Sequence, residues 1–97
     1  MMKPGVIILD FKDNVATVLK EITQGEQVEL LGFGKVIQLA ARERIPFAHK
    51  IAIRDILEGE DIVKYGYVIG KATNNIERGE HVHVHNVIST RVRVQME

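Results

Sequence analysis

One seven-residue phrase recurs three times in this 97-residue chain and constrains its fold more than any other feature. The phrase reads Ile-x-x-Gly-Glu-x-(Val/Ile), and its copies span residues 22–28, 56–62 and 76–82. The first Ile ends a buried strand, the glycine accepts positive φ in a turn, and the last Val or Ile begins the next buried run. Each copy therefore predicts a strand, a tight turn and a second strand, with turns at Gly25, Gly59 and Gly79.

The glutamate of the phrase recurs as regularly as its glycine. Glu26, Glu60 and Glu80 occupy the same place in the three copies. A carboxylate beside a tight turn is either solvated or accepts hydrogen bonds from turn amides. The repetition favours a structural role for all three.

The first two copies belong to a longer repeat, in which residues 15–22 align with residues 49–56. "NVATVLKEI" alone is compatible with a short helix, but its counterpart "HKIAIRDI" alternates with the period of a strand, so both are predicted as strands. "GVIILDF", "KVIQLA" and "YVIGKAT" predict further strands, and "RVRVQ" predicts an edge strand. Pro46 predicts a loop or strand start, and "LAARER", residues 39–44, a helical turn.

Composition indicates one small, mostly β domain over residues 1–97. The chain is 45% hydrophobic with three Phe, two Tyr and no Trp, so Val, Ile and Leu must supply the core. Thirteen basic residues balance thirteen acidic ones, which disfavours nucleic acid or an anionic membrane as a partner. The chain has no cysteine, no signal-peptide pattern and no membrane-length apolar run, which predicts a cytoplasmic protein.

The stretch "HVHVH" places His81, His83 and His85 at every second position. If this stretch is a strand, Val82 and Val84 face the core and the three imidazoles share the opposite face. Imidazoles two residues apart on one strand can bind a single metal ion, with a further ligand from elsewhere in the fold. The same alternation is also typical of a solvated strand face, and the spacing alone leaves both interpretations open.

A longer pattern then connects the histidines with a known family. "IPFAHKIAIRDILEGEDIVKYGYVIGKATNNIERGEHVHVHN" resembles the N-terminal SAF-type β-clip domain of the altronate and galactarate dehydratase family, which includes the small alpha subunit of sulfolactate sulfo-lyase. "DNVATVLKEITQGEQV" is similar to the opening segment of that family. The shared positions are Pro46, His49-Lys50, Arg54-Asp55-Ile56, Gly59-Glu60, Lys64-Tyr65-Gly66, Ile69-Gly70, Ala72-Thr73, Ile76, Gly79 and Val82-His83-x-His85-Asn86.

The resemblance implies a compact β-clip (SAF-like) fold with short strands and tight Gly turns. It also implies a subunit of a metal-dependent hydro-lyase or sulfo-lyase, with iron as the usual divalent metal. The substrate would be a hydroxylated sugar acid such as altronate or galactarate, or sulfolactate. The main catalytic part would belong to a larger partner subunit, so this chain alone is expected to be inactive.

The resemblance also assigns roles to individual residues. His49, His83 and His85 fall on motif positions and are predicted as catalytic residues and metal ligands, whereas the pattern does not require histidine at position 81, so His81 is predicted as solvated or auxiliary. Asn86 is predicted to bind substrate. Lys50 is predicted to pair with a substrate carboxylate, a role that competes with that of an exposed strand lysine. Two alternatives are a carbohydrate-binding β-clip module without catalysis and a structural adaptor that forms homo-oligomers and docks a catalytic chain.

Overall fold

The computed structural model describes residues 6–7, 11–32 and 35–89. In this part of the chain the regular structure is entirely β, with nine short strands, and no helix that could span a membrane is present. The strands are β1 (Val6–Ile7), β2 (Val15–Thr17), β3 (Gln27–Gly32), β4 (Lys35–Ala40), β5 (Lys50–Ala52), β6 (Asp61–Lys64), β7 (Tyr67–Ala72), β8 (His81–Val82) and β9 (Val87–Ser89). The prediction of a mostly β fold with short strands is confirmed.

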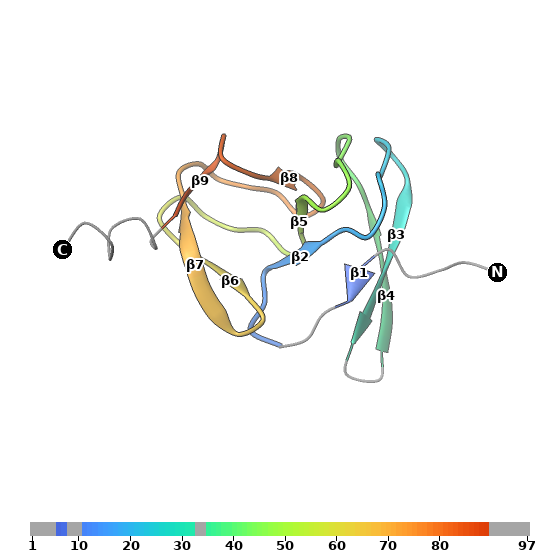
Figure 1. The fold of residues 1–97 in the computed structure, drawn as a ribbon, viewed down its shortest axis with the longest axis horizontal. Coiled ribbons are helices and arrows are strands. Elements are labelled where there is room, and N and C mark those ends of the chain that lie inside the picture. The colour runs from blue at the N-terminus through green and yellow to red at the C-terminus, as the bar shows by residue number, and fades with distance from the viewer. Residues whose placement is uncertain (1–5, 8–10, 33–34, 90–97) are drawn as a thin grey trace.

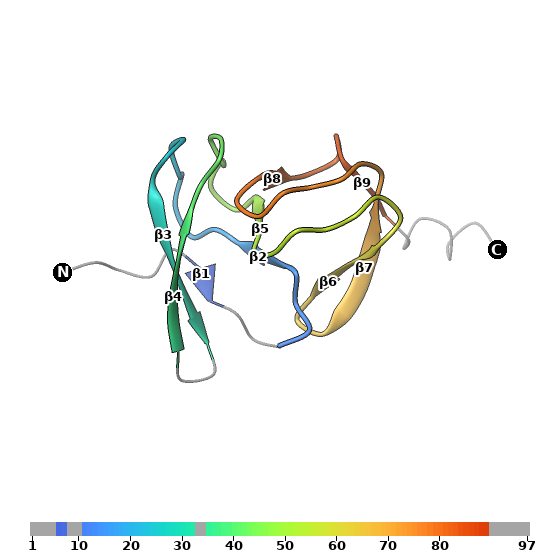
Figure 2. The same ribbon diagram turned by 180° about the vertical axis from the view of Figure 1, so that it is seen from behind.

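The strands form three small sheets of three strands each within the described residues (Figure 1). One sheet has the order β1-β3-β4, with β1 parallel and β4 antiparallel to β3. The other two, β2-β5-β8 and β6-β7-β9, are antiparallel. The β2-β5-β8 sheet lies between the other two in both views (Figures 1 and 2).

The central sheet continues beyond its strands as isolated bridges with the same register. The β2–β5 pairing pairs Val15 with Ala52 and extends to a bridge between Ile22 and Ile45. On the other side of β5, Lys50 pairs with Val82, and this ladder extends to a bridge between Ile56 and Ile76. Residues 45–56 therefore pair with two segments distant in sequence, and this arrangement brings the start of β5 beside β8.

Two hydrophobic clusters lie on opposite sides of the β2–β5 pair. Alternation along the strands sends Val15 and Ala52 into one cluster and Ala16 and Ile51 into the other, as the period of two requires. Isoleucine dominates the most deeply buried positions, which confirms the prediction of an aliphatic core. These side chains, each at most 2% exposed, are Ile22, Ile45, Ile51, Ile56, Ile62 and Ile76.

The three predicted turns are confirmed, and their glutamates are structural. Gly25, Gly59 and Gly79 have φ of 86°, 90° and 95°. Each glycine N–H donates to an alanine carbonyl of the neighbouring segment, at 2.8 Å in all three turns. The glutamate carboxylate accepts a hydrogen bond from the N–H that follows the phrase's first isoleucine; the donors are Thr23, Leu57 and Glu77.

A fourth turn has the same backbone geometry but a different sequence. It follows Ile45, and Ala48 occupies the glycine position with φ of 71°. The Ala48 N–H donates to the Val18 carbonyl, and the His49 N–H donates to the Pro46 carbonyl, which repeats the bonds of the other turns. His49 thus stands where the other copies carry glutamate. Pro46 has no N–H for a carboxylate to bind, so the glutamate has no capping role here.

Two other predictions for this region have different outcomes. The helical turn predicted for residues 39–44 is wrong: Leu39 belongs to β4, and Ala41 exchanges backbone hydrogen bonds with the first turn through Gly25 and Glu26. Because this pairing uses the backbone donor and acceptor of Ala41, it competes with a helix. The edge strand predicted for "RVRVQ" lies outside the described residues.

Candidate functional site

The histidine stretch does not continue as the predicted strand. β8 ends at Val82, and residues 83–86 form a turn that leads into β9. Val84, predicted to face the core, is instead 82% exposed. The prediction of a strand through His85 with Val84 inside is therefore wrong, and only Val82 of the two valines is buried.

Asn86 explains why the strand stops. Its side-chain Oδ1 accepts a hydrogen bond from the His83 N–H at 2.9 Å, and its own N–H donates to the His83 carbonyl at 3.1 Å. Its Nδ2 donates to the His81 carbonyl at 2.9 Å. Asparagine side chains commonly stabilise turns through such local bonds. Asn86 is buried and fixes the backbone around the histidines, while its predicted contact with substrate remains a prediction.

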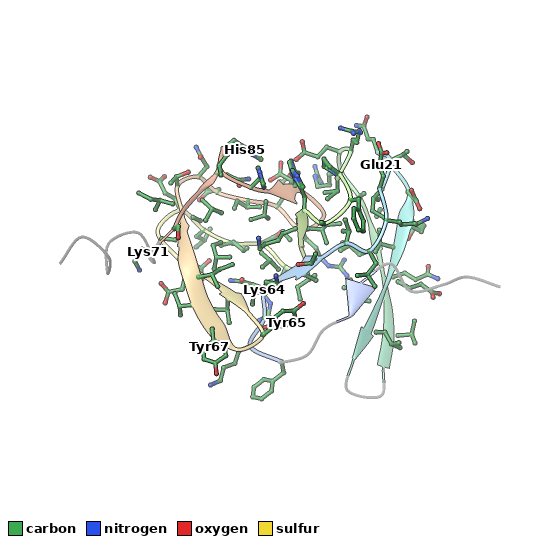
Figure 3. The ribbon with its side chains drawn as sticks, viewed as in Figure 1. Glu21, Lys64, Tyr65, Tyr67, Lys71 and His85 are labelled. Atoms are coloured by element: carbon green, nitrogen blue, oxygen red, sulfur yellow. The ribbon has the colours of Figure 1, made fainter. Side chains whose placement is uncertain are left out.

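All four histidines lie together despite the turn, and we call them the imidazole cluster: His49, His81, His83 and His85. His49 stacks on His83 with ring centroids 4.0 Å apart and an interplanar angle of 15°. The rings of His81 and His85 are tilted by 37°, with centroids 5.1 Å apart. Figure 3 shows His85 beside the turn between β8 and β9. His49 reaches the cluster from the Ala48 turn, directly before β5.

Three of these rings can converge on one ion. One ring nitrogen from each of His49, His81 and His83 lies within 4.8 Å of the other two, and His49 Nδ1 is 2.8 Å from His81 Nε2. Metal–nitrogen bonds of roughly 2.0–2.1 Å require nitrogens about 3–3.5 Å apart, so the rings would have to move from these positions to bind one ion. Without a metal, the close pair of nitrogens is a hydrogen bond in which the N–H of one ring donates to the nitrogen of the other.

The structure therefore groups different histidines from those that the sequence analysis favoured. His49 and His83 are in the set of three nitrogens as predicted, but His81 takes the place predicted for His85. A signal for His81 was present in the repeated phrase. The third phrase bridges Ile76 to Ile56, and that register continues to His81 opposite Ile51, two residues from His49. The catalytic and metal-binding roles themselves remain predictions.

The surroundings of two imidazoles of the cluster, His81 and His83, favour their neutral forms. Burial is the largest cause that lowers the pKa of His81 from its usual 6.5, and the other three imidazoles add to it, whereas Glu43 raises it. The pKa of His83 is also lowered, first by burial and then by the charges of His49, Lys50 and His85. Neutral rings have a free nitrogen lone pair, which can bind a metal or accept a proton.

Glu43 and Lys50 complete the site. The Glu43 carboxylate accepts a hydrogen bond from the His81 N–H at 2.9 Å and so holds the start of β8. Lys50 is half-buried and lines a pocket of about 400 Å³ together with His83. Burial, followed by the charge of Lys64, lowers the pKa of Lys50. Lys50 was predicted from the sequence as a substrate-binding residue, whereas Glu43 and Lys64 had no predicted role.

Comparison with known proteins gives one family for almost the whole chain. The family model described as the altronate/galactarate dehydratase SAF domain matches residues 4–90. The alpha subunit of (2R)-sulfolactate sulfo-lyase from Chromohalobacter salexigens is 38% identical over 94 residues, which cover 93% of this chain and 99% of that subunit. The corresponding subunit from Paracoccus pantotrophus is 39% identical over 54 residues, or 56% of this chain and 81% of the relative.

A second kind of relative is much longer. Altronate dehydratase from Bacillus subtilis is 38% identical over 85 residues, which cover 88% of this chain but only 16% of the enzyme. The chain thus corresponds to a small part of a dehydratase and to nearly the full length of a sulfo-lyase alpha subunit.

Proposed function

The chain belongs to the altronate/galactarate dehydratase SAF-domain family, and from this premise we propose that it is the small subunit of a metal-dependent lyase. The lyase would remove water or sulfite from a small hydroxy acid such as galactarate, altronate or sulfolactate. The larger part of the catalytic machinery would belong to a separate, longer subunit.

The match with the sulfolactate sulfo-lyase alpha subunit carries this proposal. Similarity to altronate dehydratase alone is compatible with a domain of a larger enzyme, because it covers 16% of that enzyme. The match with the alpha subunit covers 99% of a relative whose name identifies it as one subunit of a lyase. This supports the same division of labour for the present chain.

The imidazole cluster supports the metal dependence. His49, His81 and His83 offer three nitrogens within reach of one ion, and their surroundings favour the neutral, ligating form of His81 and His83. We propose these three as the metal ligands, with iron as the first metal to test. A bound divalent metal would supply Lewis-acid stabilisation of the charge that develops when a proton is removed beside a carboxylate.

The remaining residues of the site have separate proposed tasks. His85 is at the edge of the cluster and outside the set of three nitrogens, so its imidazole is available to accept or donate a proton. Lys50 would hold a substrate carboxylate from the adjoining pocket. Asn86 would act indirectly, because its amide fixes the backbone of His81 and His83.

The experiment is co-expression with a longer lyase-like chain from the same genome, followed by assays with galactarate, altronate and sulfolactate. We expect the two chains to co-purify and to turn over one of these acids, and we expect neither chain alone to do so. Turnover by the present chain alone, or a pure complex without lyase activity on any of the three acids, would contradict the proposal.

Single alanine variants in that complex separate the two sets of histidines. His81→Ala should remove most bound metal, as measured by elemental analysis, and reduce turnover by a factor of about 100. His85→Ala should leave the metal content unchanged. The opposite result would favour the set predicted from the sequence, in which His83 and His85 bind the metal.

A further inference from the structure

A pocket of about 400 Å³ adjoins the imidazole cluster and is lined by residues from both the central sheet and the β6-β7-β9 sheet. Its wall is mainly aliphatic and includes the deeply buried Ile62 and Val82. Four polar side chains also line it: Lys50, Lys64, His83 and Ser89. Figure 3 shows Lys64 near the end of β6, facing the middle of the molecule.

Apart from His83, the pocket has two ionisable side chains, Lys50 and Lys64, and both are positively charged. Elsewhere in the chain, Lys20 forms an ion pair with Glu26 at 2.6 Å, and Lys71 forms one with Asp61 at 2.8 Å. Neither Lys50 nor Lys64 has a carboxylate within ion-pair distance among the residues that the structure describes.

Within the described part of the chain, the pocket therefore holds two like charges against an apolar wall without an internal counter-ion. Lys64 has a cation–π contact, with its Nζ 4.8 Å from the centre of the Tyr65 ring, but this contact does not neutralise it. Two half-buried ammonium groups that repel one another are stabilised when anionic groups enter the space between them.

We propose that this pocket is a substrate subsite selective for hydroxy acids that carry two acid groups, with Lys64 binding one group and Lys50 the other. This inference rests on the proposed function and narrows its substrate class. Galactarate has two carboxylates and sulfolactate has a carboxylate and a sulfonate, whereas altronate has a single carboxylate. The acid group on Lys50 would lie beside His83, at the edge of the imidazole cluster.

Binding to the intact chain tests the subsite without any lyase activity. The probes are malonate, acetate and glycerol, which are small molecules with two, one and no acid groups. We expect malonate to cause saturable NMR shifts at the amides of Lys64, His83 and Ser89, and to bind at least about tenfold more tightly than acetate. Glycerol should cause no shifts. Equal affinities for malonate and acetate, or no shifts with malonate at these amides, would overturn the proposal.

Matched lysine variants separate a specific subsite from general attraction of anions. Lys64→Met should weaken malonate binding about tenfold, whereas Lys64→Arg should retain it because the positive charge remains. Lys71→Met is the control, since Lys71 of β7 lies on the outer side of the molecule and pairs with Asp61 (Figure 3). An equal loss in the Lys64→Met and Lys71→Met variants would overturn the subsite.

The assembled enzyme then distinguishes the two proposals. Lys64→Met should raise the KM for the two-acid substrate with little change in kcat, because Lys64 holds the end away from the cluster. If malonate binding depends on Lys64 but no complex has lyase activity, the subsite stands and the proposed function fails. If the complex prefers altronate, or if Lys64→Met leaves KM unchanged, the proposed function stands and the subsite fails.

Discussion

The three Gly-Glu turns and the turn at Ala48-His49 share one backbone design and differ in their side chains. In the first three, glycine adopts positive φ without strain and glutamate binds a free turn N–H. In the fourth, Ala48 has φ of 71° despite its Cβ, and Pro46 removes the N–H that a glutamate would bind. The side chain of residue 49 is thus not needed by its own turn.

This difference explains how a structural repeat came to carry a candidate site. His49 uses its freedom to contact His81, with Nδ1 and Nε2 2.8 Å apart, and to stack on His83. The backbone of the fourth turn fixes where His49 begins, and the register between β5 and β8 fixes where His81 begins. The turn geometry that stabilises the fold in three places therefore positions an imidazole in the fourth.

The largest expected effect on stability is a difference between the turns at Gly79 and Gly59. At Gly79, an added Cβ would lie 2.5 Å from the Ala40 carbonyl oxygen, whereas at Gly59 it would meet nothing within 4 Å. Gly79→Ala should therefore lower the free energy of unfolding by about 3 kcal/mol or more, because positive φ and a backbone clash add together. Gly59→Ala has only the φ strain and should lose about 1–2 kcal/mol. Urea denaturation checks both values, and equal losses would contradict the role of packing at Gly79.

The second prediction compares the glycine with the glutamate of one turn. Glu60→Ala removes the acceptor for the Leu57 N–H and should lower the free energy of unfolding by about 1 kcal/mol. Gly59→Val should lower it more, by roughly 2 kcal/mol, because a β-branched side chain is strained at φ of 90°. Glu58→Ala is the control for loss of a neighbouring exposed carboxylate. A larger loss for Glu60→Ala than for Gly59→Val, in the same thermal or urea melts, would mean that the hydrogen bond of Glu60 contributes more to stability than the conformational freedom of Gly59.

The repeated phrase was sufficient to predict the turns, and the apolar runs and the composition were sufficient to predict the short strands and the aliphatic core. Each of these features depends on local conformation, alternation or residue type. The fourth turn was not recognised, since Ala48 and His49 replace both residues that define the phrase. The end of β8 depends on side-chain bonds from Asn86, which periodicity does not contain. His81 was underrated because its partner His49 is remote in sequence and becomes close only through strand register. Lys64 enters the pocket from another sheet, and no local pattern indicates this.

A third prediction concerns the dependence of stability on pH, which should come from the imidazole cluster and not from the glycine turns. The folded state lowers the pKa of His81 below 6.5, so the unfolded chain binds this proton more readily. Stability is therefore full at alkaline pH and is lost as the pH falls from about 6.5 towards the lower pKa of the folded state. Urea denaturation between about pH 8 and pH 5.5 should show this loss, with a smaller slope in His81→Asn. Identical slopes in the two proteins would mean that His81 does not contribute.

The smallest expected effect on stability concerns the fourth turn, at Ala48. Ala48→Gly removes the Cβ from a residue with φ of 71° but also increases the freedom of the unfolded chain, so the two changes partly cancel. We expect a gain in the free energy of unfolding of about 0.5 kcal/mol, opposite in sign to the loss for Gly59→Ala. The ring signals of His49 and His81 in NMR spectra should stay in place, because the backbone bonds of Ala48 to Val18 do not depend on its side chain. A loss of stability in Ala48→Gly would mean that the alanine methyl group contributes more through its contacts than it costs in strain, and the fourth turn would then differ from the others in packing as well as in chemistry.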